Sequence, residues 1–375
     1  MPRPIKALVH TDSLRQNLAF VSGVLQATTV PSKVWAVIKA NAYGHGIEAA
    51  VDGFGKADGL ALLDLEEAIR ARQAGWTKPI LLLEGPFEVG DLDLARDYQL
   101  TPVIHHPEQL RMLEAQACAS LDMSLDIYVK LDTGMTRLGF VQSDYLRAFE
   151  RIDALIRAGR VGKATYMTHF ACADRPDGLE EPLQRFARMA GHRPGAWCLS
   201  NSAASLLHPG RVAAFAAEHG RELWSRPGIC LYGASPLSER SADQIGLKPA
   251  MTLRSELISV KDVQAGEGIG YGHLFIADKP MRVGVVACGY ADGYPRHAPT
   301  GTPMRVGERI TRIVGRVSMD MIMVDLTGMP DAEVGTGVVL WGEGGPSADE
   351  VARSAGTISY ELLSGVTARV PRVMV

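Results

Sequence analysis

The sequence is poor in cysteine, and the few cysteines that it has are not paired. Five occur among 375 residues, none in a Cys-x-x-Cys pair, and each stands among apolar or small residues. They are Cys118, Cys172, Cys198, Cys230 and Cys288. An odd number of widely spaced cysteines indicates reduced thiols and argues against both a disulfide framework and a zinc site. We therefore expect no metal centre.

Long apolar runs and an excess of one charge are also missing. No stretch approaches the ~20 consecutive apolar residues of a membrane-spanning helix, and the N-terminal MPRPIKALVH has no targeting character. The 39 basic and 42 acidic side chains leave a net charge of -3, which gives no electrostatic reason to bind nucleic acid or an anionic membrane. We expect a cytoplasmic protein without nucleic-acid or membrane partners.

The sequence also has no internal repeat, no low-complexity tract and no GxGxxG fingerprint. From about residue 34 to residue 232, eight short apolar or β-branched runs alternate with segments of helical periodicity. Strands that are apolar on both faces and alternate with helices form parallel sheets. Since no dinucleotide-binding fingerprint opens the first unit, eight such units favour an α/β fold of the (β/α)8 barrel type over a doubly wound sheet. The strand candidates are VWAVI, GLALL, PILLL, TPVIH, LDIYVKL, KATYMTH, AWCLS and LWSRPGICLYG.

The segments between these strands carry apolar residues at helical spacing. They are DLEEAIRARQAG, EVGDLDLARDY, PEQLRMLEAQA, QSDYLRAFERIDALI and PLQRFARMA. An opening helix is expected after Thr11 and Asp12. Its apolar face consists of Leu14, Leu18, Val21 and Leu25.

The pattern changes after about residue 240, where alternating strands and glycine turns replace the helical segments. Examples are MTLRSELISVKDV, MRVGVVACG, ERITRIVGRV, DMIMVDL and GTGVVLW. Residues 235–250 are polar and contain Pro and Gly, as expected of a linker. Because 375 residues exceed what one core usually covers, we predict a barrel over residues 1–240 and a mostly-β domain over residues 241–375. A short helix capped by Ser347 is expected near the C-terminus.

One lysine stands where a barrel carries its active site. Lys39 ends the first strand candidate, and the C-terminal ends of barrel strands form the active-site face. Taken alone, such a lysine is more often solvated in a turn. Polar residues follow the other strand candidates at the equivalent end, namely Arg137, His169, Asn201, Ser202 and Arg226. Because these strand ends converge on one mouth, the sequence predicts an active site there.

The loops after the seventh and eighth strands are where a barrel commonly binds phosphate. They supply the hydroxyl of Ser202 and, around Gly228 and Ile229, backbone amides that a ligand can approach closely. The alternative for Ser202 is the N-cap of a helix. A phosphate beside a barrel lysine suggests a phosphorylated aldehyde cofactor held as a Schiff base, which is the arrangement of pyridoxal phosphate.

Nine motifs, taken in order, resemble those of the alanine racemase family. They are AVIKANAYGHG, LDTGMTRLGF, MTHFACAD, SNSAA, RPGICLYG, GIGYGH, GYADGYPR, GRVSMDMIMVD and YELLSGVTARVPR. The resemblance runs from about residue 30 to residue 372. It implies a barrel followed by a β domain, a head-to-tail homodimer, pyridoxal 5'-phosphate as cofactor, and interconversion of L-alanine and D-alanine.

The resemblance also implies two acid/base groups. Lys39 resembles the Schiff-base lysine, which serves as the base on one face of Cα once the substrate has released it. Removing a proton from one face and delivering one to the other needs a second group opposite the lysine. Tyr271, in GIGYGH, resembles that group and in the family reaches the cofactor of the other subunit. A phenol with a pKa of ~10 is a poor base, so it needs a neighbour, for which His169 and Arg226 are the candidates by resemblance.

Further cofactor contacts follow from the same resemblance. Tyr43 and Tyr360 resemble residues near the cofactor phosphate, and Arg226 resembles the group that hydrogen-bonds the pyridine nitrogen. A guanidinium gives up no proton at working pH, so the ring is a weaker electron sink than beside a carboxylate. This favours proton transfer over transamination and decarboxylation. Without the family, the tyrosines could be packed aromatics and Arg226 a surface ion-pair residue.

Substrate recognition falls, by resemblance, to Arg137 and to the backbone amide of Met319. A guanidinium binds a carboxylate through two hydrogen bonds. Tyr290 and Asp320 resemble residues at the entrance, contributed across the dimer.

Lys130 alternates with apolar neighbours and shares its strand face with Asp132, so we expect it to point into the barrel. Family members often carry a carbamate on the matching lysine, which orients the nearby arginine. The sequence does not say whether Lys130 is modified.

Two other classes of protein stay open at this point. A pyridoxal phosphate decarboxylase on the same barrel plan would carry a carboxylate opposite the pyridine nitrogen and would have a longer chain. A non-catalytic pyridoxal phosphate-binding protein would lack one of the two bases, and both Lys39 and Tyr271 are present. A racemase could make D-alanine, a peptidoglycan precursor in bacteria, or serve the breakdown of L-alanine. The sequence does not distinguish between these two roles.

Overall fold

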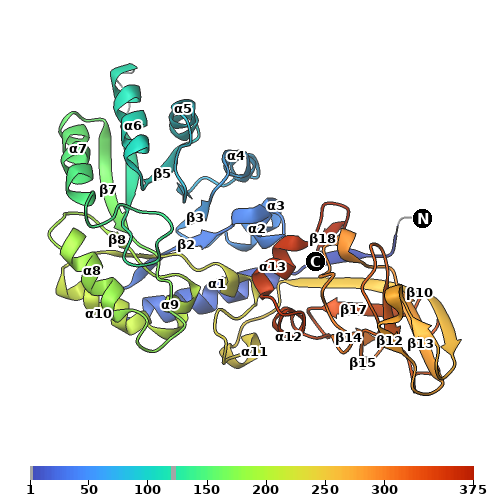
Figure 1. Ribbon diagram of the computed structural model, residues 1–375. Helices are drawn as coiled ribbons and strands as arrows, with labels where there is room; N and C mark the ends of the chain where they lie inside the picture. The colour runs from blue at the N-terminus through green and yellow to red at the C-terminus, as the bar shows by residue number, and fades with distance from the viewer. Residues whose placement is uncertain (1–2, 120–123) are drawn as a thin grey trace.

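The computed structural model describes residues 3–119 and 124–375, with side chains left out of the description over 116–119. Figure 1 shows two lobes side by side, a barrel surrounded by helices and a β domain that also holds both ends of the chain. In the described part of the chain, no helix combines the length and the apolar character needed to cross a membrane.

A closed barrel of parallel strands forms the larger lobe, in the order β2-β3-β4-β5-β6-β7-β8-β9. The strands are β2 (Ser32–Val37), β3 (Gly59–Leu62), β4 (Ile80–Leu82), β5 (Leu100–Ile104), β6 (Leu125–Lys130), β7 (Val161–Met167), β8 (Trp197–Cys198) and β9 (Leu223–Ser225). Every residue of β3 and β4 is buried, as expected of strands that are covered on both faces. The predicted barrel is confirmed, and each strand candidate overlaps a barrel strand.

Helices surround the barrel strands (Figure 1). They are α1 (Thr11–Gln26), α2 (Lys39–Tyr43), α3 (Ile47–Gly53), α4 (Leu65–Gln73), α5 (Gly90–Asp97), α6 (Pro107–Ala119), α7 (Tyr145–Arg157), α8 (Glu180–Ala190), α9 (Ser202–Leu207) and α10 (Pro209–Glu218). The expected apolar face of α1 is buried in full, and each such leucine contributes about 1.5–3 kcal/mol. The expected start of α1 was wrong, because Thr11 already belongs to the helix and His10 precedes it without a capping side-chain bond.

The smaller lobe is built on a sheet with the order β15-β14-β17-β10-β1-β18, to which β13 and β16 are attached through β10. Its strands are β1 (Lys6–Val9), β10 (Met251–Val263), β13 (Met281–Val286), β14 (Pro303–Val306), β15 (Arg309–Arg312), β16 (Ile322–Asp325), β17 (Gly337–Trp341) and β18 (Arg372–Met374). A separate pair consists of β11 (Gly268–Ile269) and β12 (Phe275–Ile276). The expected mostly-β domain is confirmed as a fold class, and Ser347 caps α12 (Ala348–Ser354) as predicted.

The first strand of the chain lies in the second domain. β1 pairs antiparallel with β10 and parallel with β18, so the chain starts in the β domain and enters the barrel through α1. The sequence analysis did not predict this pairing. The linker is also docked, because Asn17 of α1 exchanges two hydrogen bonds of 2.8 Å with the backbone of Lys248. Within the linker, Ser241 caps α11 (Ala242–Ile245).

Four cysteines are described, and all of them are free thiols, namely Cys172, Cys198, Cys230 and Cys288. The side chain of Cys118 lies outside the described part of the chain. Three of the four thiols are buried, and Cys172 is partly buried.

Candidate active site

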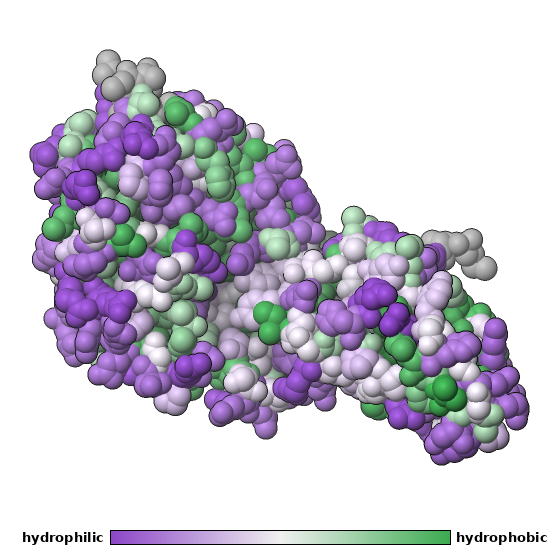
Figure 2. Space-filling view, viewed as in Figure 1, coloured by the Kyte–Doolittle hydropathy of each residue, from purple (hydrophilic) through white to green (hydrophobic). Residues whose placement is uncertain are grey.

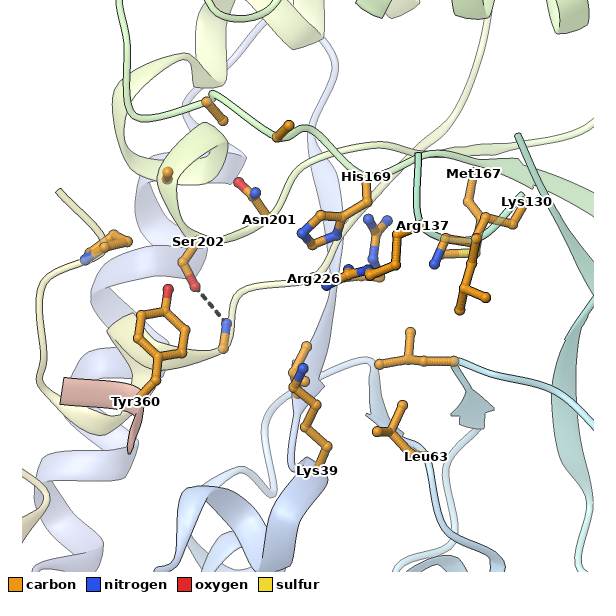
Figure 3. A pocket seen from close by; sticks show the side chains of 18 of the residues that line it. Lys39, Leu63, Lys130, Arg137, Met167, His169, Asn201, Ser202, Arg226 and Tyr360 are labelled. Carbon is orange, nitrogen blue, oxygen red and sulfur yellow. Dashed lines mark hydrogen bonds between the residues drawn. The ribbon is translucent and has the colours of Figure 1, made fainter. Parts of the chain in front are cut away.

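A cavity of about 590 Å³ lies at the C-terminal ends of the barrel strands. Most of the barrel residues expected at the mouth line it, and so does Tyr360 of α13 (Ser359–Gly365), which comes from the second domain. The expected residues that line it are Lys39, Tyr43, Lys130, Arg137, His169, Asn201, Ser202, Arg226, Gly228 and Tyr360. In Figure 3, Lys39 points toward Arg226 and His169, whereas Tyr360 and Ser202 lie together on another side. The structure therefore brings the expected barrel residues into one cavity.

Lys39 begins an unusual turn. The next four residues have left-handed backbone angles, with φ of 55° at Ala40, 51° at Asn41, 55° at Ala42 and 50° at Tyr43. Each such L-residue costs about 1–2 kcal/mol, so the surroundings must hold the turn. The Asn41 amide donates to Oε1 of Glu67 at 2.5 Å. The turn directs Lys39 into the cavity mouth and places Tyr43 in the cavity wall.

The cavity holds more positive than negative groups. Five basic side chains line it, namely Lys39, Lys130, Arg137, His169 and Arg226, against the two carboxylates of Glu84 and Asp174. Among the described residues, no carboxylate lies within 4.0 Å of any of the five bases. An anionic ligand would compensate this charge.

The surplus of positive charge and the burial lower the pKa values of Lys39, Lys130 and His169. Burial lowers the pKa of Lys39, and the nearby Arg137 lowers it further. Burial and then Arg226 lower the pKa of Lys130 to about 8. The same two causes, burial first, lower the pKa of His169 to about 2, so its imidazole is neutral at physiological pH.

Arg226 is fixed by the ends of neighbouring strands. Its side chain is buried, Nη1 donates to the Cys198 carbonyl at 2.7 Å, and Nη2 donates to the Thr168 carbonyl at 2.6 Å. The alternative of a surface ion pair is wrong, because the guanidinium is buried and bonded to carbonyl groups. The side chain therefore faces the cavity in a fixed orientation.

The loops after β8 and β9 form a polar cradle. Oγ of Ser202 accepts a hydrogen bond of 2.8 Å from the Gly228 amide (Figure 3). Asn201, not Ser202, caps α9, because its Oδ1 accepts from the Ala204 amide at 3.0 Å. The N-cap alternative for Ser202 is therefore wrong. A side chain at Gly228 would place its Cβ 2.4 Å from the Tyr43 hydroxyl, so glycine is needed there.

Donor groups of this cradle are left without partners in the described residues. The amide of Ile229, which opens the 3-10 helix η1 (Ile229–Tyr232), donates no hydrogen bond to any described residue. Burial raises the pKa of both the Tyr43 and the Tyr360 hydroxyls, which keeps them neutral and able to donate. The cradle has the donors that a phosphate requires.

Apart from Ile229, which belongs to the cradle but does not line the cavity, the remaining expected residues lie in the second domain, outside the cavity of their own chain. Tyr271 is 70% exposed in the turn η2 (Tyr271–His273), and Met319 is 53% exposed. Tyr290 begins η3 (Tyr290–Asp292), and Asp320 follows Met319 in the next loop. A single chain therefore does not bring these residues together with Lys39.

The sequence analysis missed several cavity residues. Leu63 is the last residue of the strand candidate GLALL and Glu84 directly follows PILLL, so the rule that placed Lys39 at a strand end applies equally to them. Asp174 and Pro236 come from loops, which no strand pattern could have placed. Glu84 matters most, because its charge opposes the lowering of the Lys39 and Lys130 pKa values.

Comparison with known proteins identifies the family. The model of the alanine racemase N-terminal domain matches residues 9–236, and that of the alanine racemase C-terminal domain matches residues 250–374. The chain belongs to the alanine racemase family. Alanine racemases from Bordetella avium and Bordetella petrii are 53% and 54% identical to it, over 99% of this chain and 99% of each relative.

Solved alanine racemases have the same fold. The biosynthetic alanine racemase from Pseudomonas aeruginosa superimposes with a TM-score of 0.90 at 44% identity, covering 100% of this chain and 99% of that one. The alanine racemase from Acinetobacter baumannii gives a TM-score of 0.87 at 33% identity, covering 100% of both chains. The expected family and fold are confirmed, and so is the expected class of enzyme, since alanine racemases are isomerases. The alanine racemase family depends on pyridoxal phosphate.

Proposed function

We propose that this protein interconverts L-alanine and D-alanine with pyridoxal phosphate, using Lys39 on one face of Cα and Tyr271 of the partner subunit on the other. The observation that carries the proposal is the cavity itself, in which the family's lysine stands beside an anion cradle and a fixed arginine. The membership of the alanine racemase family supports the reaction and the substrate.

The residues present fit the cofactor. The phosphate would be held by a set of residues that combine neutral hydroxyls with a free amide and a glycine that allows close approach. They are Tyr43, Ser202, Gly228, Ile229 and Tyr360. Arg226, His169 and Asn201 would stand along the ring. When bound, pyridoxal phosphate supplies an aldehyde that condenses with an amine and a ring that makes the Cα–H bond of an amino acid acidic.

Lys39 is suited to accept a proton. Its lowered pKa increases the fraction of neutral amine, which is the form that attacks an aldehyde and that can take a proton from Cα. Arg226 offers hydrogen bonds but releases no proton at working pH, which disfavours the decarboxylation and transamination that need a strongly electron-accepting ring. These two residues together favour proton transfer.

Arg137 would bind the substrate carboxylate. Its guanidinium is exposed to the cavity and has no carboxylate partner within 4.0 Å among the described residues. Lys130 would support it as a carbamate, because an amine with a pKa of about 8 is partly neutral and can take up carbon dioxide, and the resulting anion would attract the guanidinium. The amide of Met319, with Tyr290 and Asp320, would close the substrate side from the partner subunit.

We propose a homodimer because one chain leaves these groups exposed. The β domain carries exposed apolar side chains next to Tyr271, of which Leu274 is 64% and Ile276 is 59% exposed. Figure 2 shows the narrow β lobe beside the barrel lobe, with hydrophobic residues on its surface. A second copy placed head to tail would cover these side chains and bring Tyr271 to the partner's cavity.

A racemisation assay tests the proposal. Purified protein loaded with pyridoxal phosphate is incubated with L-alanine in D2O, and both D-alanine and deuterium at Cα are measured. We expect both to appear without loss of carbon dioxide. Carbon dioxide release would instead support the decarboxylase alternative, and cofactor binding without deuterium incorporation would support a binding protein.

A further inference from the structure

A cluster of four charged side chains joins both ends of the chain to the loops of the β domain. The carboxylate of Asp292 is 0% exposed, and its Oδ1 lies 2.8 Å from Nη1 of Arg3 and 3.0 Å from Nε of Arg369. Nη2 of Arg369 donates to Asp320 at 2.7 Å, and Nη2 of Arg3 donates to the Asp320 carbonyl at 2.8 Å. We refer to Arg3, Asp292, Asp320 and Arg369 as the Asp292 clamp.

Every partner of the buried carboxylate is a donor. While the two guanidinium groups contact Oδ1, the amide of Gly289 donates to Oδ2 at 2.9 Å. A side-chain amide at position 292 could accept on one side only and would place its own N–H groups against N–H donors on the other. A buried ion pair is by itself weak evidence for stability, so its place in the structure must explain it.

The clamp holds two loops against each other. The Tyr290 amide donates to the Ser318 carbonyl at 3.1 Å, and the Ala291 amide donates to the Met319 carbonyl at 3.0 Å. A side chain at Gly289 would place its Cβ 2.3 Å from the Met319 carbonyl oxygen. The clamp therefore fixes the peptide groups on both sides of Met319.

The same loops present the groups that the proposed function assigns to the other subunit. Met319 is 53% exposed, and its amide donates no hydrogen bond to any described residue. Tyr290 stands 36% exposed at the start of η3. Both residues are exposed, and both belong to the backbone that the Asp292 clamp holds.

We propose that Asp292, with Arg3 and Arg369, is a positioning element that orients the Met319 amide and Tyr290 for the active site of the partner subunit. This inference rests on the proposed function. We expect the clamp to act on substrate binding rather than on the cofactor, because none of its four residues lines the cavity that contains Ser202 and Gly228. It also gives the N-terminal segment a role, since Arg3 closes the cluster.

Asp292→Asn tests the inference in the holoenzyme. We expect the KM for alanine to rise about tenfold, which corresponds to one misplaced hydrogen bond in binding, while kcat changes less than about threefold. The cofactor absorbance and the dimer mass should stay the same. Hydrogen exchange, measured by mass spectrometry, should speed up at the amides of Tyr290 and Ala291.

Asp153→Asn is the matched control. Asp153 forms a two-bond ion pair with Arg193, which lines the depression at the opposite end of the barrel. It should lower stability without changing the KM or the exchange of the 289–292 turn. Arg3→Lys keeps the positive charge at position 3, so its KM for alanine should stay close to the wild-type value.

The outcomes separate the two proposals. A normal KM in Asp292→Asn, or a KM raised equally in Asp153→Asn, would overturn the positioning role. If the wild-type protein does not racemise alanine, the proposed function is wrong. The exchange measurement then still decides whether Asp292 orders the two loops, and unchanged exchange at Tyr290 and Ala291 would reject the clamp as well.

Discussion

Lys130 shows how a single residue can be read in two ways. It is 6% exposed, lies among other cations, and has no carboxylate partner within 4.0 Å in the described residues. A buried lysine in such surroundings is either partly neutral or modified. An unmodified Lys130 should lower the free energy of unfolding at neutral pH, whereas a carbamate would make favourable contacts.

Lys130→Met should stabilise the unmodified, cofactor-free protein at neutral pH. The pKa of Lys130 falls from 10.5 to about 8 on folding. Between these values the unfolded chain binds more protons than the folded one, so the wild-type free energy of unfolding rises with pH across this window. Below pH 8 the lysine costs about 3 kcal/mol, which methionine would remove, and the advantage should vanish above pH 10.5.

Guanidinium unfolding in carbonate-free buffer, at pH 7 and at pH 10.5, measures this difference. If the methionine variant is less stable than the wild type at pH 7, Lys130 makes favourable contacts, as a carbamate would.

Two further substitutions separate the proposed bases. Lys39→Ala should abolish the absorbance of the lysine-bound cofactor as well as turnover, because the proposed function assigns the imine-forming amine to Lys39 and not to Lys130, the other lysine that lines the cavity. Tyr271→Phe should keep the cofactor absorbance, since Lys39 and the cradle residues that would hold the cofactor are unchanged, but it should reduce turnover about 100-fold or more, chiefly from L-alanine. Absorbance spectra and initial rates in both directions measure the two effects. Near-normal rates in Tyr271→Phe would refute its role as a base.

Individual residues were predictable where a strand end marked them. The positions of Lys39, His169 and Arg226 followed from the apolar runs that precede them. Glu84 was missed although it directly follows the run PILLL, because the strand-end pattern was recognised from basic, amide and hydroxyl side chains alone. The capping role of Asn201 in place of Ser202 could not be predicted, since adjacent cap residues differ only in backbone angles.

At the scale of elements, the left-handed turn after β2 is the most demanding feature. The turn ends at Gly44, whose φ is 81°. A Cβ at this position would lie 2.0 Å from the carbonyl oxygen of Leu363 in α13. The turn is thus held between the barrel and the second domain.

Gly44→Ala should therefore destabilise the protein far more than an alanine at an open glycine. Gly75 is the matched control, with φ of 95° and no neighbouring atom within 4 Å of a built Cβ. We expect a cost of about 1–2 kcal/mol for Gly75→Ala from the left-handed backbone alone, and more than about 3 kcal/mol for Gly44→Ala. Equal free energies of unfolding for the two variants would contradict this account of the turn.

The elements themselves were predicted unevenly. The barrel strands were recognised because their residues are apolar on both faces, and β10 matches its predicted segment over its full length, Met251–Val263. β1 was missed, because a run of four residues does not reveal a partner about 245 positions away. The left-handed turn was also invisible, since KANAY contains no glycine to mark it.

At the scale of the whole molecule, the proposed function divides each active site between two chains. The barrel lobe offers Lys39 and the cofactor cradle, and the β lobe offers Tyr271, Met319 and Tyr290 at its surface. Periodicity and composition predicted the two lobes, but the assignment of Tyr271 to a second subunit came from motif resemblance alone. A local sequence pattern does not indicate which surface of one subunit contacts which surface of the other.

A hybrid dimer tests this division most directly. Lys39→Ala and Tyr271→Phe subunits are mixed, dissociated and reassociated, and racemisation of L-alanine is compared with that of each parent. If Lys39 and Tyr271 of different chains share a site, each hybrid contains one intact site, and random mixing should restore about a quarter of the wild-type activity. Hybrid dimers that form, as seen by native mass spectrometry, but gain no activity would contradict the account.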